Sequence, residues 1–231
     1  MFGYYSTDFG YLLLLIPLLI LSAWASSNVN RTYDRYARIG NSRGMSGAQV
    51  AEMILRANGI CDVRLEVTGG HLTDHYHPKQ KVIRLSQDVY YGQSMAAVGV
   101  AAHEAGHAVQ YAKGYLPVRF RALILPAVQF SNKWTMLLMM IGLLLGFFEL
   151  AMAGLILFGI VTFFQFVTLP VEFNASRRAL KALEGYAGMS AQDVDGASKV
   201  LRAAALTYVA AFAITLLQFL RFFAMINRRR D

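Results

Sequence analysis

Two histidines and a glutamate in the segment AAHEAGHAVQ, residues 101–110, have the spacing of a zinc-binding catalytic helix. On a helix, residues four apart lie on one face, so His103 and His107 can offer imidazole nitrogens to one ion. Glu104 follows the first histidine directly and can reach a water molecule beside that ion rather than the ion itself. The H-E-x-x-H pattern therefore predicts two metal ligands and a general base.

The same short pattern also arises by chance in ordinary helices, so the surrounding sequence must support it. All five histidines of the chain fall between residues 71 and 107. Gly106, inside the motif, costs a helix up to about 1 kcal/mol relative to alanine. A glycine at this position predicts the close approach of another backbone.

Catalytic zinc takes three protein ligands and leaves one position for water. Glu149 does not qualify as the third ligand, because it lies at the tip of a predicted membrane hairpin, about a membrane thickness from the motif. Glu172 lies where two crossings return the chain to the starting side, at the predicted start of a helix after Pro170. A carboxylate at a membrane boundary is costly unless it is paired or bound to metal. We favour Glu172 as the third ligand, with Glu184, which a solvated helix surface explains equally well, as the alternative.

The elements that must position these residues are largely membrane segments. The chain has 231 residues, of which 56% are hydrophobic, and the runs 9–25 and 150–171 contain no charge. About 20 apolar residues cross a hydrocarbon core of about 30 Å, so these runs are predicted spans. The first run could instead be a signal peptide, because Ala23-Trp24-Ala25 resembles a cleavage site. Its leader lacks Lys and Arg, which favours an anchor.

We expect a membrane α+β fold with three to four transmembrane helices and a small zincin-like domain, made of a short antiparallel sheet and the H-E-x-x-H helix. The apolar stretch after residue 122 divides near Gly146–Glu149 into two arms. The run 203–226 either crosses the membrane or lies along its interface. The predicted segments are an anchor at 9–26, a zincin-like catalytic segment at 27–121, a helical hairpin at 122–171, a helical segment with the third ligand at 172–202, and a C-terminal apolar helix with a basic tail at 203–231.

Local signals predict the elements of the catalytic segment. Ser46 is the expected N-cap of a helix that stops at Gly59. Ser190 and Asp193 form a capping-box-like pair before a later helix. The runs DVRLEV, HLTDHY and KVIRLS between residues 62 and 86 predict the small antiparallel sheet. If HLTDHY or KVIRLS is an exposed edge strand, it can bind an extended peptide.

Charge predicts the orientation of the chain. Twelve Lys and Arg residues lie between residues 31 and 121, and five lie between 177 and 202. The leader and the hairpin tip have none, which places the N-terminus outside and both polar segments inside. If the run 203–226 crosses the membrane, the basic tail NRRRD lies outside, which disagrees with this charge rule.

The net charge of +8 is better explained by cytoplasmic loops and anionic headgroups than by nucleic acid. A single cysteine, Cys61, excludes an internal disulfide.

If the predicted zinc site hydrolyses peptide bonds, it also needs a donor for the oxyanion that forms in the reaction. The candidates for such transition-state or substrate contacts are His75, His77, Tyr90, Arg177 and Arg178. His75 and His77 alternate along one strand face, where they either line a groove or lie on the surface. The pair Arg177 and Arg178 also fits a solvated or headgroup-contacting face.

The segments HEAGHAVQ, TDHYHPKQKVIRLS and LPVEFNASRRAL resemble the YugP-type neutral zinc metallopeptidases of bacteria, over nearly the whole chain. The resemblance implies a membrane-bound zinc peptidase with His103, His107 and Glu172 as ligands and Glu104 as base. A more distant likeness is to the HtpX and CAAX prenyl proteases, which use an E-x-x-x-D pattern. Here the last position of that pattern is Ser176, so Asn174 or Ser176 is the candidate to hydrogen-bond a ligand.

We therefore expect a Zn²⁺-dependent peptidase of the bacterial cytoplasmic membrane, with its site facing the cytoplasm. Its expected partners are peptide or membrane-protein substrates, the lipid bilayer, and a regulatory membrane partner or a second copy, with no nucleic acid. The alternative is a catalytically silent, zinc-containing membrane scaffold or adaptor, against which the intact Glu104 argues. A transporter is less supported, because no charged residue sits mid-span with a plausible intramembrane partner.

Overall fold

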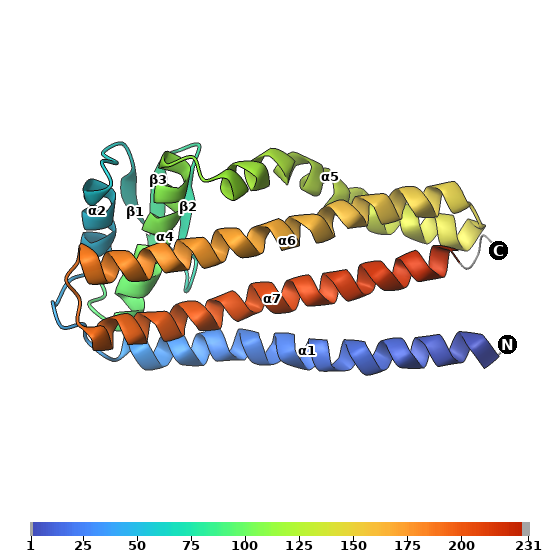
Figure 1. Ribbon diagram of the computed structural model, residues 1–231, viewed down its shortest axis with the longest axis horizontal. Coiled ribbons are helices and arrows are strands. Elements are labelled where there is room, and N and C mark those ends of the chain that lie inside the picture. Colours follow the sequence, from blue (N-terminus) through green and yellow to red (C-terminus); the bar gives the residue numbers. More distant parts are fainter. Residues whose placement is uncertain (1, 228–231) are drawn as a thin grey trace. The chain divides into compact units, whose positions relative to one another are not determined.

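The computed structural model describes residues 2–227, and the side chains of residues 13 and 15–227. The predicted basic tail beyond residue 227 lies outside the described residues. The elements, shown in Figure 1, are mostly helical: α1 (Phe2–Ala37), α2 (Gly47–Ala57), β1 (Arg64–Thr68), β2 (His75–His77), β3 (Val82–Ser86), α3 (Gln87–Tyr90), α4 (Met95–Ala112), α5 (Leu116–Leu145), α6 (Phe148–Gly185) and α7 (Ala191–Asn227).

The described residues fall into two compact units. The first, which we call the site unit, comprises Ser26–Arg119 and Pro170–Leu206. The second, which we call the apolar unit, comprises the described residues within Met1–Ala25, Phe120–Leu169 and Thr207–Asp231. Four helices, α1, α5, α6 and α7, contribute residues to both units.

The small sheet is mixed, so the prediction of an antiparallel sheet was wrong for one of its two pairings. The strand order is β1-β3-β2. Strand β1 runs parallel to β3, with Arg64 opposite Val82, and β2 runs antiparallel to β3, with His75 opposite Arg84. The KVIRLS strand is central, and its Val82, Ile83 and Leu85 are all fully buried, as in strands covered on both faces. Strand β2 is one edge.

The predicted caps of the site unit are confirmed. Ser46 and Gln49 form a complete capping box at the start of α2. Gly59 has a φ of +72° directly after that helix, which is the left-handed conformation expected of a stop residue. The Ser94 hydroxyl accepts from the backbone N–H of Ala97 and begins α4. The helix that carries the H-E-x-x-H motif thus has a well-defined start.

The core of the site unit is made of apolar side chains from helices and sheet together. Strand β3 contributes Ile83 and Leu85, and α2 contributes Ile54. The C-terminal half of α6 contributes Leu183, and the first turns of α7 contribute Leu201. All five side chains are less than 5% exposed. These contacts hold α4 against α6, which carry the candidate site.

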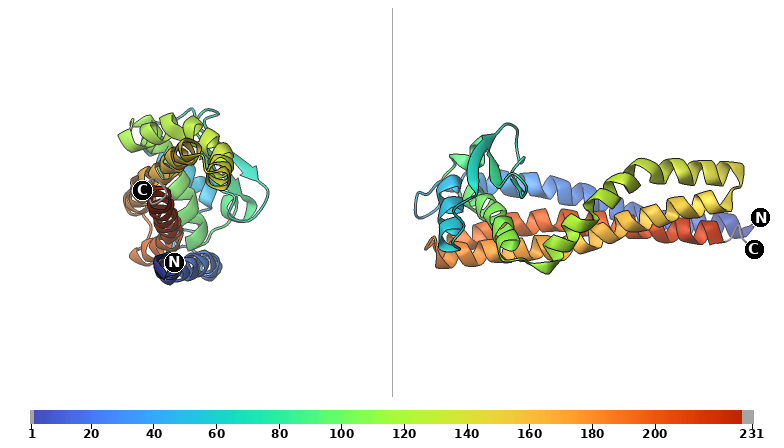
Figure 2. Two further views of the ribbon diagram at one scale, coloured as in Figure 1. Left: turned by 90° about the vertical axis from the view of Figure 1, so that its right-hand side faces the viewer. Right: turned by 90° about the horizontal axis from the view of Figure 1, so that it is seen from above.

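The apolar unit contains the predicted hairpin, whose turn is seen in yellow in Figure 2. Helix α5 ends at Leu145 and α6 begins at Phe148, so the predicted division near Gly146–Glu149 is confirmed. Gly146 has a φ of +74°, which favours glycine at this turn. A Cβ on Gly142 would lie only 2.3 Å from the backbone nitrogen of Ala151. Glycine therefore lets the two helices approach closely.

Three helices in the described part of the chain, α5, α6 and α7, are long and apolar enough to cross a membrane. The predicted span at 9–26 lies within helix α1, and several of its side chains lie outside the described residues. That span stays a prediction. The division of the chain into five segments also stays a prediction, and α6 and α7 run without interruption through positions 171–172 and 202–203.

Helix α6 begins earlier than the sequence predicted. The prediction that a helix begins after Pro170 was wrong, because Pro170 lies inside α6. A proline in a helix removes one hydrogen bond and usually kinks or breaks it. Here the next turn carries Val171 and Ala175, both fully buried in the site unit. Burial of this face favours continuation of the helix beyond the proline.

Candidate metal centre

Helix α4 and the C-terminal half of α6 approach each other closely at the H-E-x-x-H motif. A Cβ on Gly106 would lie 2.8 Å from the carbonyl oxygen of Ala175 in α6. The prediction that this glycine admits another backbone is therefore confirmed. The contact places the face of α4 that carries the two histidines directly against the turn of α6 that carries Glu172.

The structure brings His103, His107 and Glu172 together. The Nε2 atoms of His103 and His107 lie 3.3 Å and 3.5 Å from Oε2 of Glu172. The two imidazole rings meet edge to face, with centroids 4.7 Å apart. One ligand atom from each of the three residues can be chosen so that all lie within 4.8 Å of one another, the only such group in the described part of the chain. Two imidazole nitrogens and one carboxylate oxygen are a donor set of catalytic zinc, so these residues fit the ion.

Burial makes the charges of this group interact strongly. Glu172 is 3% exposed and Glu104 is 8% exposed. Burial alone lowers the pKa of His107, but its hydrogen bond to Glu172 and the charges of Glu104 and Glu172 outweigh this effect and raise the pKa above the ordinary value. The two carboxylates thus favour positive charge at His107, and a metal cation would meet the same preference.

Asp74, in the loop before β2, lies within electrostatic range of the motif. Burial raises the pKa of the Asp74 carboxyl. Hydrogen bonds from the backbone N–H and hydroxyl of Ser86 oppose this effect, and the charge of Glu104 adds to it. The loop between β1 and β2 therefore brings a second carboxyl into the surroundings of Glu104.

A buried glutamine fixes the other side of His107. The Nδ1 atom of His107 lies 3.0 Å from Oε1 of Gln110, whose side chain is fully buried. The Gln110 amide donates to the carbonyl of Val171 at 2.8 Å and to Oδ1 of Asn174 at 3.0 Å. Gln110 thereby connects a candidate ligand in α4 to the α6 backbone beside Glu172.

Gln110 was not among the residues predicted from the sequence, because hydrogen-bond partners for the histidines were expected only on the segment around Glu172. A signal was available in the sequence. Gln110 follows His107 by three residues, which places both on one face of the same helix.

Of the two predicted hydrogen-bond partners, Ser176 contacts a candidate ligand directly. Its Oγ lies 3.1 Å from Nδ1 of His103. Asn174 acts through Gln110 instead, and its Oδ1 also accepts from Nε of Arg178 at 2.7 Å. The Nδ1 atoms of both histidines, which point away from Glu172, are therefore within hydrogen-bond distance of polar side chains.

The other predicted site residues lie outside the ligand group. Glu184 and Arg177 are exposed on α6, and the ring of Tyr90 packs against that of Tyr91, with centroids 4.8 Å apart. His75 is exposed, with Nδ1 2.8 Å from the carbonyl oxygen of Thr73. His77 is partly buried and accepts from the backbone N–H of Gln80. Both histidines lie on the edge strand β2.

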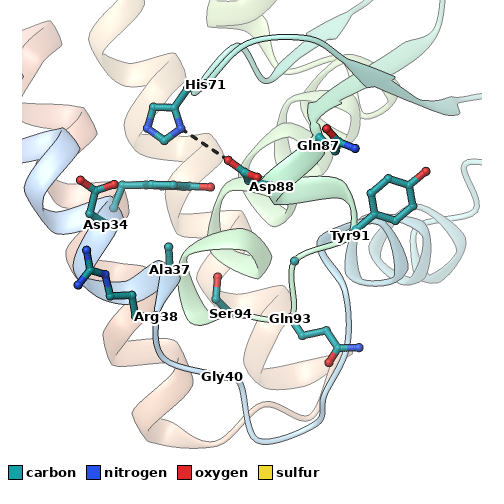
Figure 3. A pocket seen from close by; sticks show the side chains of 12 residues that line it. Asp34, Ala37, Arg38, Gly40, His71, Gln87, Asp88, Tyr91, Gln93 and Ser94 are labelled. Atoms are coloured by element: carbon teal, nitrogen blue, oxygen red, sulfur yellow. Dashed lines mark ion pairs between the residues drawn. The ribbon is translucent and has the colours of Figure 1, made fainter.

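A separate cleft of about 780 Å³ lies in the site unit, between the end of α1 and the segment around α3 (Figure 3). Asp34 and Arg38 of α1 face it, together with His71 from the loop after β1. Nδ1 of His71 lies 4.0 Å from Oδ2 of Asp88. The residues that line it do not include His103, His107 or Glu172. This cleft is distinct from the candidate metal centre.

The structure is that of a membrane-associated protein with a ligand set suited to zinc. The candidate ligands are the histidine pair on α4 and the glutamate from α6, and the membrane association rests on the three apolar helices. Comparison with known proteins agrees with that class of protein. A family model described as "Putative neutral zinc metallopeptidase" matches residues 11–227, and the chain belongs to this family. The family name implies zinc, and the group formed by His103, His107 and Glu172 can hold a metal ion.

A curated relative extends the comparison. The chain is 43% identical over 221 residues to the "Putative membrane protease YugP" of Bacillus subtilis (strain 168), covering 96% of this chain and 98% of the relative. No solved structure matches the chain. The relative's name and the three apolar helices together indicate association with a membrane.

Proposed function

We propose that the protein is a membrane-bound zinc metallopeptidase that hydrolyses peptide bonds. The observation that carries this proposal is the convergence of His103, His107 and Glu172, from two helices, beside the buried Glu104. A structural metal site has no need of an adjacent free carboxylate, whereas a hydrolytic site requires a base. Membership of the zinc metallopeptidase family supports the same reading.

The residues of the chain divide the work in this proposal. His103, His107 and Glu172 hold the ion, and when bound the zinc supplies a Lewis acid that polarises the peptide carbonyl and activates water. Glu104 takes the proton from the attacking water and passes it to the leaving amine. Ser176 and Gln110 hold the two imidazole rings in orientation through their outward nitrogens.

The substrate of such a site is a peptide chain in extended form. Strand β2 lies at the edge of the sheet and packs on α4, where the rings of Tyr76 and Tyr111 meet with centroids 5.7 Å apart. An edge strand can bind an extended peptide through backbone hydrogen bonds. We propose His75 and His77, on this strand, as substrate contacts.

We further propose that the site faces the cytoplasm of a bacterium, with the N-terminus outside. The distribution of Lys and Arg supports this orientation. A site unit joined to apolar helices favours membrane proteins or peptides near the membrane as substrates. Regulation by a membrane partner or by a second copy of the chain belongs to the same proposal.

Metal analysis and a cleavage assay on detergent-purified protein test the proposed function together. The zinc content of wild type should be near one per chain, and Glu172→Ala should lose it while Glu184→Ala, at an exposed glutamate of the same helix, should retain it. Casein cleavage should fall about 10²–10⁴-fold in Glu104→Gln, which removes the base.

Each other outcome has a definite meaning. Absence of zinc from the wild type would overturn the metal centre and return the motif to an ordinary helix. Zinc without cleavage by wild type would favour the alternative, a catalytically silent membrane scaffold. A cleaving Glu104→Gln variant would remove Glu104 from the reaction.

A further inference from the structure

A small groove of about 280 Å³ lies between α1 and α7 within the site unit. The two helices are close here, since a Cβ on Gly196 would lie 3.1 Å from a ring carbon of Tyr36. They run side by side in Figure 1. Helix α1 lines the groove with polar, cationic and aromatic side chains, and α7 lines it with two cations and two apolar residues: Asn28, Thr32, Arg35, Tyr36, Lys199, Arg202, Ala203 and Leu206.

The groove concentrates positive charge. The guanidinium of Arg35 lies 5.6 Å from the ring centroid of Tyr36, and the ammonium of Lys199 lies 5.9 Å from the same centroid. Arg202 follows Lys199 by three residues, on the same face of α7. Lys199 pairs with Asp195, while no carboxylate of the described residues forms an ion pair with Arg35 or Arg202. Like charges gathered in this way repel one another until an anion joins them.

The groove also lies where both of its helices change from apolar to charged sequence. Helix α1 carries no charge from residue 9 to residue 30, and α7 carries none from residue 203 to residue 220. Trp24, half exposed, precedes the groove by one turn of α1. A tryptophan near the end of an apolar run, before a segment that carries cationic side chains, is typical of the boundary region of a bilayer. Leu206, an apolar residue of the groove, is 38% exposed.

We propose that this groove binds the phosphate group of an anionic phospholipid. Arg35 and Arg202 bind the phosphate oxygens, since guanidinium groups form paired hydrogen bonds with phosphate. Asn28 and Thr32 provide polar contacts for the rest of the headgroup, and Leu206 contacts the beginning of an acyl chain. The groove shares no residue with the candidate metal centre, so this site is independent of the proposed function.

Lipid retention by the full chain tests the proposal. The protein is reconstituted in nanodiscs of equimolar phosphatidylcholine and phosphatidylglycerol, released into mild detergent, and analysed by native mass spectrometry for bound lipid. Wild type should retain phosphatidylglycerol in preference to phosphatidylcholine. The double variant Arg35→Gln/Arg202→Gln should bind it about 30-fold more weakly, from the usual contribution of each cation near an anionic lipid.

A matched variant separates the groove from net charge. Arg56→Gln/Lys79→Gln removes two exposed cations from α2 and from the turn before β3, and it should retain phosphatidylglycerol as wild type does. Zinc content and melting temperature, measured in all variants, show whether each is folded. Equal retention by the two double variants, both folded, would overturn the groove as the site.

Inorganic phosphate distinguishes the two sources of a phosphate group. If the lipid is the ligand, free phosphate at the same concentration should leave the bound phosphatidylglycerol in place, because it lacks the acyl contact with Leu206. If free phosphate displaces the lipid fully, or binds wild type while no lipid is retained, the lipid assignment is wrong.

Discussion

Gln110 links the two helices of the candidate metal centre through one fully buried side chain. Its amide oxygen holds His107, and its amide nitrogen satisfies the carbonyl of Val171, one residue before Glu172. Hydrogen-bond partners of this kind set the tautomer and orientation of a ligand, and their loss typically costs 10–100-fold in metal affinity.

We expect Gln110→Leu to lower zinc affinity about 10–100-fold, measured by competition with a chromogenic chelator. The leucine also leaves buried polar groups of α6 without their donor, so the melting temperature should fall as well. Gln110→Glu should recover part of the zinc affinity, since its carboxylate can accept from His107 but cannot donate to Val171. Gln80→Leu, at an exposed turn, is the control. Unchanged affinity in Gln110→Leu would exclude this role.

At the scale of elements, the approach of α4 to α6 determines whether the three ligands meet. The approach depends on Gly106, because any side chain there meets the backbone of Ala175. Backbone atoms cannot move aside as a flexible side chain can, so an added methyl group must separate the helices.

Gly106→Ala is therefore expected to lower the free energy of unfolding by about 1–3 kcal/mol, although alanine favours helix. It should also weaken zinc binding, because Glu172 lies on the displaced turn. Gly185→Ala is the matched control, since a Cβ on that helical glycine meets nothing within 4 Å. Thermal unfolding in detergent compares the two. Equal melting temperatures would show that the helices separate at little cost.

At the scale of the whole molecule, orientation in the membrane can be read from one residue. Cys61 is the single cysteine of the chain, and it is exposed in the site unit. A cytoplasmic site unit predicts that a membrane-impermeant maleimide labels Cys61 only after the cells are opened. In a Cys61→Ala background, Phe147→Cys at the exposed hairpin turn should be labelled in intact cells. The reverse pattern of labelling would invert the proposed orientation.

Local sequence patterns located the strands but did not predict how they pair. The sequence marked three β-prone runs, and three strands form there. Which strands pair depends on what covers each face of the sheet, and no run carries that information alone. Strand β3 became central because its apolar side chains are buried on both faces. Similarly, the local chemistry of Pro170 indicated the start of a helix. The helix instead continues through Pro170, because the burial of Val171 and Ala175 favours it.

The sequence by itself determined the chemistry that the chain can attempt: the two histidines and the glutamate of one helix, the need for a third ligand, and the long apolar runs. These follow from periodicity and residue type, which are local properties. Only the tertiary structure decided that Glu172 lies 3.3 Å and 3.5 Å from the two imidazoles, that Ser176 contacts His103, and that Gln110 donates to the carbonyl of Val171. Those contacts join residues of α4 to residues of α6 more than sixty positions away, and they exist only because the two helices pack against each other at a glycine.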